Sequence, residues 1–101
     1  MSEVTNEQCY EALARVIDPE LGLDIVSLGL VYRVEVQGAQ VLVDMTMTSP
    51  GCPVAEQLIF EANNEVLKIP GVEKAHVNLV WDPLWNPERM SPEAKMALGF
   101  A

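Results

Sequence analysis

The sequence predicts a small α+β domain, a two-layer α/β arrangement with the element order α-β-β-α-β-α and a three-stranded mixed sheet. Stretches with the helical spacing of apolar residues alternate with stretches in which apolar and polar residues alternate strictly. The second and third strands are separated by a helix, so they should be parallel, whereas the first two are close enough to form a hairpin. With 101 residues, we expect positions 1–101 to form a single domain.

The first helix is expected at residues 6–17. Thr5 and Gln8 match a capping box. The helix should end at Asp18-Pro19, because the residue before a proline avoids the α region. One apolar stripe faces the core and comprises Cys9, Ala12, Leu13, Val16 and Ile17. Residues 18–28 then read as a loop that its many apolar side chains hold against the body of the domain.

A hairpin follows, with strands at about 30–37 and 40–47. Gly38-Ala39 forms its two-residue turn, for which a glycine at the first position favours type II′. When Gln37 faces Gln40, every apolar pair falls on one face of the hairpin. These pairs are Val36–Val41, Val34–Val43, Tyr32–Met45 and Leu30–Met47.

The second face of the predicted sheet combines charged and apolar side chains. Arg33 should meet Asp44 as an opposite-charge pair. Val31, Leu42 and Val80 make this face partly apolar, so it should be covered by the tail or by a second subunit. A three-stranded sheet also has open edges that proteins usually cover or pair. These features together predict a homodimer.

The second helix is expected at 53–68 and should be terminated by Pro70-Gly71. The third strand follows at about 73–80. Ser91-Pro92 then begins a last helix, with serine as the cap and proline at the first position. The core-facing residues of the second helix and third strand are Ala55, Leu58, Ile59, Ala62, Val66, Ile69, Ala75, Val77, Leu79 and Trp81.

The most informative segment, residues 46–53, connects the second strand to the second helix. Cys52 precedes Pro53, which suits the first position of a helix. Unpaired N–H groups and the positive end of the helix dipole favour a thiolate there, and a thiolate can act as a nucleophile or a metal ligand. The alternative is a buried turn cysteine that packs as a small hydrophobic residue. Thr46 and Thr48 lie on the same side of the strand, where they either donate to a thiolate or simply suit the strand.

Other candidate groups are few. Asp18 and Glu20 flank a proline, and such a pair either performs acid–base or metal chemistry or stops a helix with a capping acid. His76 is the single histidine, and it is either a solvated strand residue or the general base of a small cysteine-dependent enzyme. Cys9, Cys52 and His76 give at most three ligands, which disfavours a permanent zinc ion or four-cysteine cluster. A transient cluster shared between subunits stays open, and no catalytic residue is assigned.

Composition excludes several classes of function. The formal net charge is −9, from 15 acidic and 6 basic residues, and the bases are scattered. Nucleic acids and anionic membranes attract clustered Lys and Arg, so neither is an expected partner. The start of the chain does not resemble a signal peptide, and no apolar run reaches the ~20 residues of a membrane span. We therefore expect a cytoplasmic protein with two free thiols.

Several motifs in order resemble a known family. They are Asp18-Pro19-Glu20-Leu21, Leu28-Gly29-Leu30-Val31-Tyr32, Met45-Thr46-Met47-Thr48, Gly51-Cys52-Pro53, Ile69-Pro70-Gly71-Val72 and Trp81-Asp82-Pro83-Leu84-Trp85. The chain resembles, over about residues 8–99, the metal–sulfur cluster biosynthetic family that includes SufT-like and PaaD-like proteins, whose members share an iron–sulfur cluster assembly domain. The resemblance implies iron–sulfur protein maturation rather than metabolic catalysis, with assembly machinery and client apoproteins as partners.

The resemblance also implies roles for particular residues. The reactive cysteine of the family corresponds to Cys52, a candidate transient ligand of a cluster, and its acidic loop corresponds to Asp18 and Glu20. No permanently bound cofactor is implied. PaaD-like proteins, which assist maturation of a ring-oxygenating complex, usually carry a cysteine-rich C-terminal part that is not present before Ala101. We therefore expect the SufT-like role.

Overall fold

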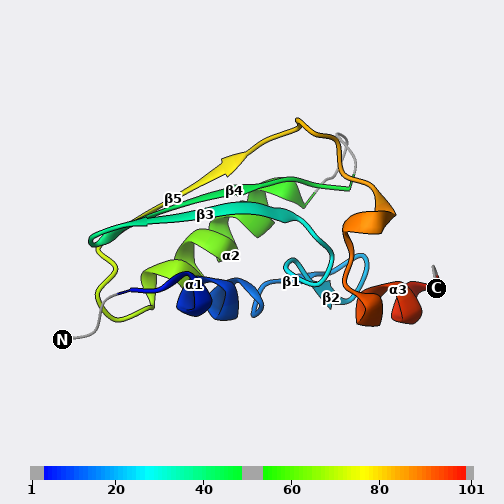
Figure 1. The fold of residues 1–101 in the computed structure, drawn as a ribbon, viewed down its shortest axis with the longest axis horizontal. Helices are drawn as coiled ribbons and strands as arrows, with labels where there is room; N and C mark the ends of the chain where they lie inside the picture. The colour runs from blue at the N-terminus through cyan, green and yellow to red at the C-terminus, as the bar shows by residue number, and fades with distance from the viewer. Residues whose placement is uncertain (1–3, 49–53, 100–101) are drawn as a thin grey trace.

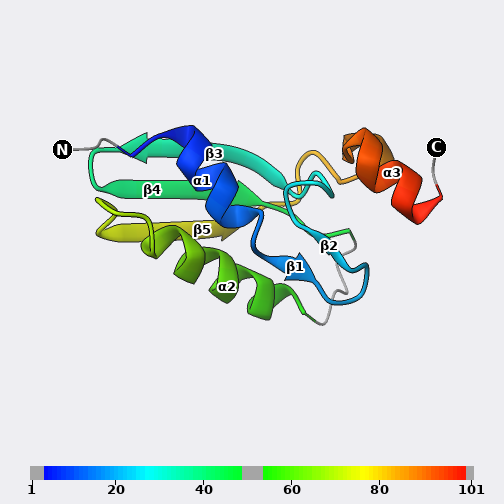
Figure 2. The same ribbon diagram turned by 90° about the horizontal axis from the view of Figure 1, so that it is seen from below.

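The protein was described with a computed structural model, which covers residues 4–48 and 54–99. A three-stranded sheet forms its centre, with β3 (Val31–Gln37), β4 (Gln40–Met45) and β5 (Lys74–Leu79) in the order β3-β4-β5. β3 and β4 are antiparallel, whereas β4 and β5 are parallel. Helices α1 (Asn6–Leu13) and α2 (Ala55–Leu67) cover one face of the sheet, and within the described ranges no helix covers the other (Figures 1 and 2). The predicted α+β architecture with a mixed sheet is confirmed.

Helix α1 begins as predicted but ends earlier. The Gln8 amide donates to Thr5 Oγ1 over 3.1 Å and the Thr5 amide donates to Gln8 Oε1 over 2.9 Å, which completes the capping box. The prediction that the helix continues to residue 17 is wrong, because Ile17–Asp18 forms strand β1. Pro19 keeps Asp18 out of the α region, and pairing with a second short strand satisfies the backbone instead. Ile17, expected in the core, is 47% exposed.

The segment expected as a loop contains a small hairpin. β1 pairs in antiparallel fashion with β2 (Leu23–Asp24), and the Gly22 amide donates to the Asp18 carbonyl over 2.7 Å. The apolar side chains that follow do hold this segment to the body, since Ile25 and Leu28 are fully buried.

The β3–β4 register follows the prediction only in part. Pairing is as expected from Gln37–Gln40 to Arg33–Asp44, but a β-bulge then places Val31 opposite Met45. A bulge adds one residue to one strand and redirects the side chains beyond it. Val31 consequently packs against the core, contrary to its predicted place on the second face.

The bulge also changes the partners of the flanking residues. Tyr32, predicted to face Met45, instead donates its hydroxyl to the Pro83 carbonyl over 2.8 Å. The predicted pairing of Leu30 with Met47 is replaced by a hydrogen bond of 2.8 Å from the Thr46 amide to the Leu30 carbonyl.

The expected charge pair on the second face is also different. Arg33 and Asp44 are opposite each other in the register, but the Arg33 guanidinium pairs with Glu35 at 2.9 Å. Asp44 instead accepts a 3.1 Å hydrogen bond from the Asn78 amide group. Residues that are two positions apart on a strand lie on the same face. Glu35 therefore competes with Asp44 for the exposed guanidinium of Arg33.

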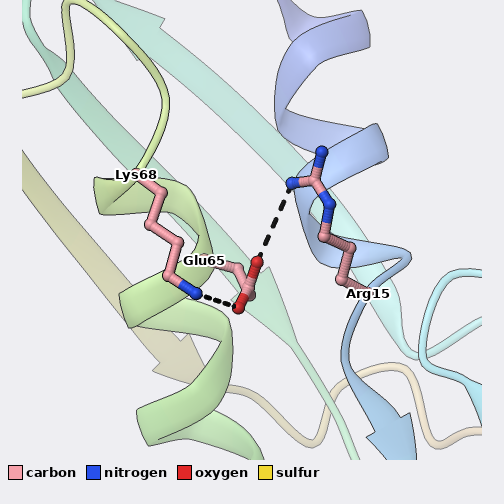
Figure 3. A network of polar contacts seen from close by, with 3 residues as sticks. All are labelled: Arg15, Glu65 and Lys68. Atoms are coloured by element: carbon pink, nitrogen blue, oxygen red, sulfur yellow. Dashed lines mark hydrogen bonds and ion pairs between the residues drawn. The ribbon is translucent and has the colours of Figure 1, made fainter.

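The core lies between the sheet and the two helices, and the predicted core faces of α2 and β5 are confirmed. Leu58, Ala62 and Val66 of α2 are fully buried. At the surface between the helices, Glu65 bridges Lys68 at 2.8 Å and Arg15 at 3.8 Å (Figure 3). Such partly exposed ion pairs contribute less than about 1 kcal/mol, so apolar packing dominates the contact between α1 and α2.

After β5 the chain continues beyond the end of the sheet at which β4 and β5 finish (Figure 1). A short 3₁₀ helix (Pro87–Arg89), which the sequence did not predict, precedes α3 (Pro92–Leu98). The Ala94 amide donates to Ser91 Oγ over 3.1 Å, which confirms the predicted cap of the last helix. In both views α3 lies beyond the end of the sheet (Figures 1 and 2).

Candidate functional site

The candidate site lies at the end of the sheet where β4 finishes. A series of backbone hydrogen bonds links the β1–β2 hairpin to this end. The Ile25 amide donates to the Val16 carbonyl over 3.0 Å, and the Leu30 amide donates to the Ile25 carbonyl over 3.0 Å. The Thr46 amide then donates to the Leu30 carbonyl. The hairpin is therefore held beside the residues that lead from β4 toward Cys52 (Figure 2).

The two acidic candidates on this hairpin have different environments. Asp18 is only 2% exposed, and its Oδ1 accepts hydrogen bonds from the Glu20 amide at 2.8 Å and the Leu21 amide at 3.3 Å. It thus acts as a local turn former, the capping-acid alternative of the sequence analysis. Glu20 is exposed to solvent. The fold therefore presents one carboxylate outward and uses the other to shape the hairpin.

Thr46 has the most unusual environment of the predicted site residues. It is fully buried, and its Oγ1 has no hydrogen-bond partner among the described residues. A buried hydroxyl without a partner costs about 1–3 kcal/mol, and such groups are rare in folded proteins. Thr48 is only partly buried, so the two threonines differ in their environment.

Cys52, the principal candidate, lies outside the described residues, as does Pro53. The structure describes the chain on both sides, up to Thr48 and from Val54 onward. Val54 is the N-cap of α2 and provides no side-chain hydrogen bond to the first turn of that helix. The side chain of Val54 therefore accepts no hydrogen bond from the first-turn N–H groups of α2. Free N–H groups at a helix N-terminus stabilise a negative charge nearby.

The second cysteine has no place in this site. Cys9 is fully buried on the core side of α1. Burial raises the pKa of the Cys9 thiol, because the thiolate would lose its solvation. Cys9 is therefore a poor nucleophile and a structural residue of the core.

His76 is separated from the candidate site. It is exposed and lies opposite Leu42, on the face of the sheet that the helices leave uncovered. Leu42 is in the half of β4 nearest the Gly38 turn, whereas Thr46 follows the other end of that strand. The role of general base to a cysteine nucleophile consequently gains no support from the position of His76.

The described residues also bear on metals and membranes. Within residues 4–48 and 54–99, no group of three or more His, Cys, Asp and Glu side chains is arranged to hold a metal ion. None of the helices in those ranges has the length and apolar character needed to cross a membrane.

The fold and these residues define a class of protein. Residues 6–79 match the family of iron–sulfur cluster assembly proteins, and the chain belongs to this family. Two curated relatives match over nearly their whole length. The Fe-S protein maturation auxiliary factor SufT of Staphylococcus aureus is 52% identical over 87 residues, covering 85% of this chain and 99% of the relative. The Fe-S protein maturation auxiliary factor YitW of Bacillus subtilis is 43% identical over 101 residues, covering 99% of each.

A solved structure and a more distant relative complete the comparison. The domain of unknown function DUF59 from Bacillus anthracis superposes with a TM-score of 0.89 at 46% identity, covering 94% of this chain and 92% of that one. One component of the putative 1,2-phenylacetyl-CoA epoxidase of Escherichia coli is 34% identical over 92 residues, covering 90% of this chain but only 55% of that protein. The resemblance to both SufT-like and PaaD-like proteins is confirmed.

The backbone hydrogen bonds that join these candidates could not be predicted from the sequence. Leu30 and Ile25 link the hairpin to Thr46, yet their side chains carry no chemistry that would single them out. The β-bulge determines which residue lies opposite Thr46. β3 contains no proline or glycine that would have predicted this bulge.

Proposed function

We propose that this protein is an accessory factor in iron–sulfur cluster assembly or delivery to client proteins, and that it is not an enzyme. Membership of the family and the similarity to two maturation auxiliary factors support this role over a small cysteine-dependent enzyme. The exposed position of His76 on the uncovered face supports the same choice, because an activated cysteine nucleophile needs a base within hydrogen-bond reach.

The observation that carries this proposal is the buried, unpartnered hydroxyl of Thr46 among the described residues. It lies six positions before Cys52 and is joined by the backbone to the hairpin that carries Asp18 and Glu20. A hydroxyl donor in a low-dielectric setting stabilises a thiolate or a sulfur ligand more strongly than it would in water. A donor within reach of a cysteine favours its thiolate form, and the thiolate is the form that binds a metal.

Cys52 is the proposed transient ligand or reactive thiol, with Thr46 and Thr48 as supporting hydroxyls. Cys9, the other cysteine, lies in the core, so Cys52 is the cysteine proposed to contact a cluster. The remaining ligands would come from a partner, which makes the cluster a cargo that passes between proteins rather than a resident cofactor. Glu20, exposed on the adjacent hairpin, is proposed to contact the partner, and Asp18 to hold Glu20 in place.

The proposed partners are the iron–sulfur assembly machinery and client apoproteins in the cytoplasm, where thiols stay reduced. The proposed working unit is a homodimer, in which the second copy contacts the face of the sheet that the helices leave open.

The test compares variants in host cells that lack the chain, with the activity of an iron–sulfur enzyme as the readout. Cys52→Ala should lower that activity while leaving the unfolding transition in place, since removing one thiol costs less than the ~2–5 kcal/mol of a large core truncation. Anaerobic pull-down should show less iron and sulfide with Cys52→Ala than with wild type. A folded Cys52→Ala protein that fully supports the enzyme would refute the role of Cys52.

Three further variants separate the roles of the two acidic residues. Glu20→Ala removes an exposed carboxylate and should weaken function with little effect on stability. Asp18→Asn keeps an oxygen that can accept from the Glu20 amide, whereas Asp18→Ala removes it and should cost about 1 kcal/mol. If the activity of the iron–sulfur enzyme falls only in the Asp18 variant that loses stability, Asp18 only shapes the turn.

A further inference from the structure

The C-terminal segment, residues 81–99, is fixed to the candidate-site end of the sheet by contacts on both sides of one exposed leucine. Before Leu84, the Tyr32 hydroxyl donates to the Pro83 carbonyl over 2.8 Å. After it, the Trp85 indole N–H donates to the Leu28 carbonyl over 2.7 Å. The two neighbours of Leu84 are therefore anchored to the body of the domain.

The anchoring continues along the segment. Arg89 stacks over the Tyr32 ring, with its guanidinium carbon 4.6 Å from the ring centroid. The Ser91 amide donates to the Ser27 carbonyl over 2.8 Å, and Met90 is almost fully buried. This part of the chain is consequently a fixed part of the surface.

Leu84 itself faces solvent. It is 68% exposed, between two residues that are hydrogen-bonded to the body of the domain. Single exposed apolar side chains are common on protein surfaces, and exposure alone identifies no function. Leu84 differs because ordering its backbone on binding costs little, which is the property that lets one apolar side chain anchor an interface.

The surrounding charge indicates the kind of partner. Asp82, Glu88 and Glu93 are exposed on the same segment; Lys95 pairs with Glu88 at 3.5 Å and Arg89 lies over the Tyr32 ring, so three acids and two cations leave the segment with a net charge of −1. A second copy docked at Leu84 would bring the same acidic groups to this surface. A partner with basic residues around an apolar pocket complements this surface instead.

We infer that Leu84 is the centre of a docking surface for a client protein whose apolar pocket is rimmed by Lys and Arg. This inference rests on the proposed function, because it takes the partner to be a protein that receives a cluster. The docking surface lies beyond the end of the sheet at which β4 and β5 finish, and Thr46 directly follows β4 at that end (Figure 1).

The probe is the apo form of a [4Fe–4S] enzyme whose activity falls in host cells lacking the chain. Binding of full-length wild type to this enzyme is compared with that of Leu84→Ala, and the affinity should fall about tenfold, as for a central interface residue. Phe60→Ala is the matched control, since Phe60 is 66% exposed on α2 and should leave the Kd unchanged. Leu84→Lys should bind more weakly than Leu84→Glu, because a basic rim repels the added ammonium.

Each other outcome overturns the inference. Unchanged binding of Leu84→Ala, no binding of wild type, or an equal loss with Phe60→Ala removes the docking surface while the proposed function stands. A change of oligomeric mass in Leu84→Lys, measured by light scattering, identifies a second copy as the occupant. If no iron–sulfur enzyme loses activity in the deletion strain, the proposed function fails and the docking surface fails with it. Thermal unfolding of each variant checks that the exposed substitutions leave the fold intact.

Discussion

Thr46 and Asp18 are polar side chains buried at the candidate-site end of the sheet, and their environments are opposite. Asp18 accepts two backbone hydrogen bonds, so its burial is compensated locally. Thr46 buries its hydroxyl with no partner among the described residues. The first arrangement stabilises the hairpin, whereas the described residues offer the Thr46 hydroxyl no compensation for its burial.

Replacing Thr46 by Val tests this cost directly. Valine has nearly the same shape but lacks the hydroxyl, so Thr46→Val should raise the free energy of unfolding by about 1 kcal/mol in urea denaturation. The same variant should lower maturation of iron–sulfur enzymes in cells. Thr48→Val, at a partly buried position, should change stability by less than about 0.5 kcal/mol. If Thr46→Val destabilises the cluster-free protein, the hydroxyl is already paired there and is not available to a transient sulfur ligand, which contradicts the interpretation.

The two thiols should differ in reactivity. Cys9 is buried and its pKa is raised by burial, so it should react with iodoacetamide only when the fold opens. Cys52 precedes the first turn of α2, which Val54 leaves uncapped, so we expect it to alkylate faster at neutral pH. Mass spectrometry of timed samples measures both rates in one tube, and denaturant should remove the difference. Equal native rates, or a faster Cys9, would contradict the prediction.

At the scale of elements, the contact between the C-terminal segment and the 27–30 turn is unusually close. Gly29 has a φ of +74°, and a Cβ atom there would overlap the backbone carbonyl of Arg89. Only glycine permits both this conformation and this approach. The position of the C-terminal segment is therefore set by a glycine far before it in the sequence.

Gly29→Ala should consequently destabilise the protein by about 3 kcal/mol or more, from strain at positive φ plus displacement of the Arg89 backbone. Gly22→Ala is the matched control, since Gly22 has nearly the same φ of +73° but open space around its Cβ position. That variant should cost only about 1 kcal/mol. Urea denaturation measures both, and similar losses would show that the Arg89 contact is not close in solution.

At the scale of the whole molecule, no helix within residues 4–48 and 54–99 covers the second face of the sheet (Figure 1). Charges on this face balance, with Arg33 and Lys74 offsetting Glu35 and Asp44. Its apolar part is smaller than the sequence indicated, because the β-bulge turns Val31 into the core. Leu42 stays on this face in a hollow of about 480 Å³ that Lys74 and His76 also line.

A homodimer through this face should give a mass of twice 11.1 kDa by light scattering at micromolar concentration. Leu42→Glu should shift that mass to the monomer, because it adds a charge at the centre of the neutral face. Phe60→Glu, on the opposite side of the molecule, is the control that should leave the mass unchanged. A monomer mass for wild type across the micromolar range would refute the dimer.

The sequence by itself determined the three helices, the three-stranded sheet and the buried faces of α2 and β5. The apolar spacing of α2, the turn at Gly38 and the cap at Ser91 are properties of a few neighbouring residues, so local patterns report them. The order of helices and strands then leaves few topologies, because a strand–helix–strand connection makes parallel strands. The role of Cys52 stays a prediction from sequence and family.

Only the tertiary structure decided how distant segments meet. The bulge that sends Tyr32 to Pro83, the backbone contact at Gly29 and the burial of Thr46 each depend on a partner far away in the chain. The early end of α1 has the same origin, because Ile17–Asp18 gains more from pairing with Leu23–Asp24 than from another helical turn before Pro19. Local propensity differs by less than about 1 kcal/mol between such alternatives, whereas non-local hydrogen bonds and burial contribute more and so select the outcome.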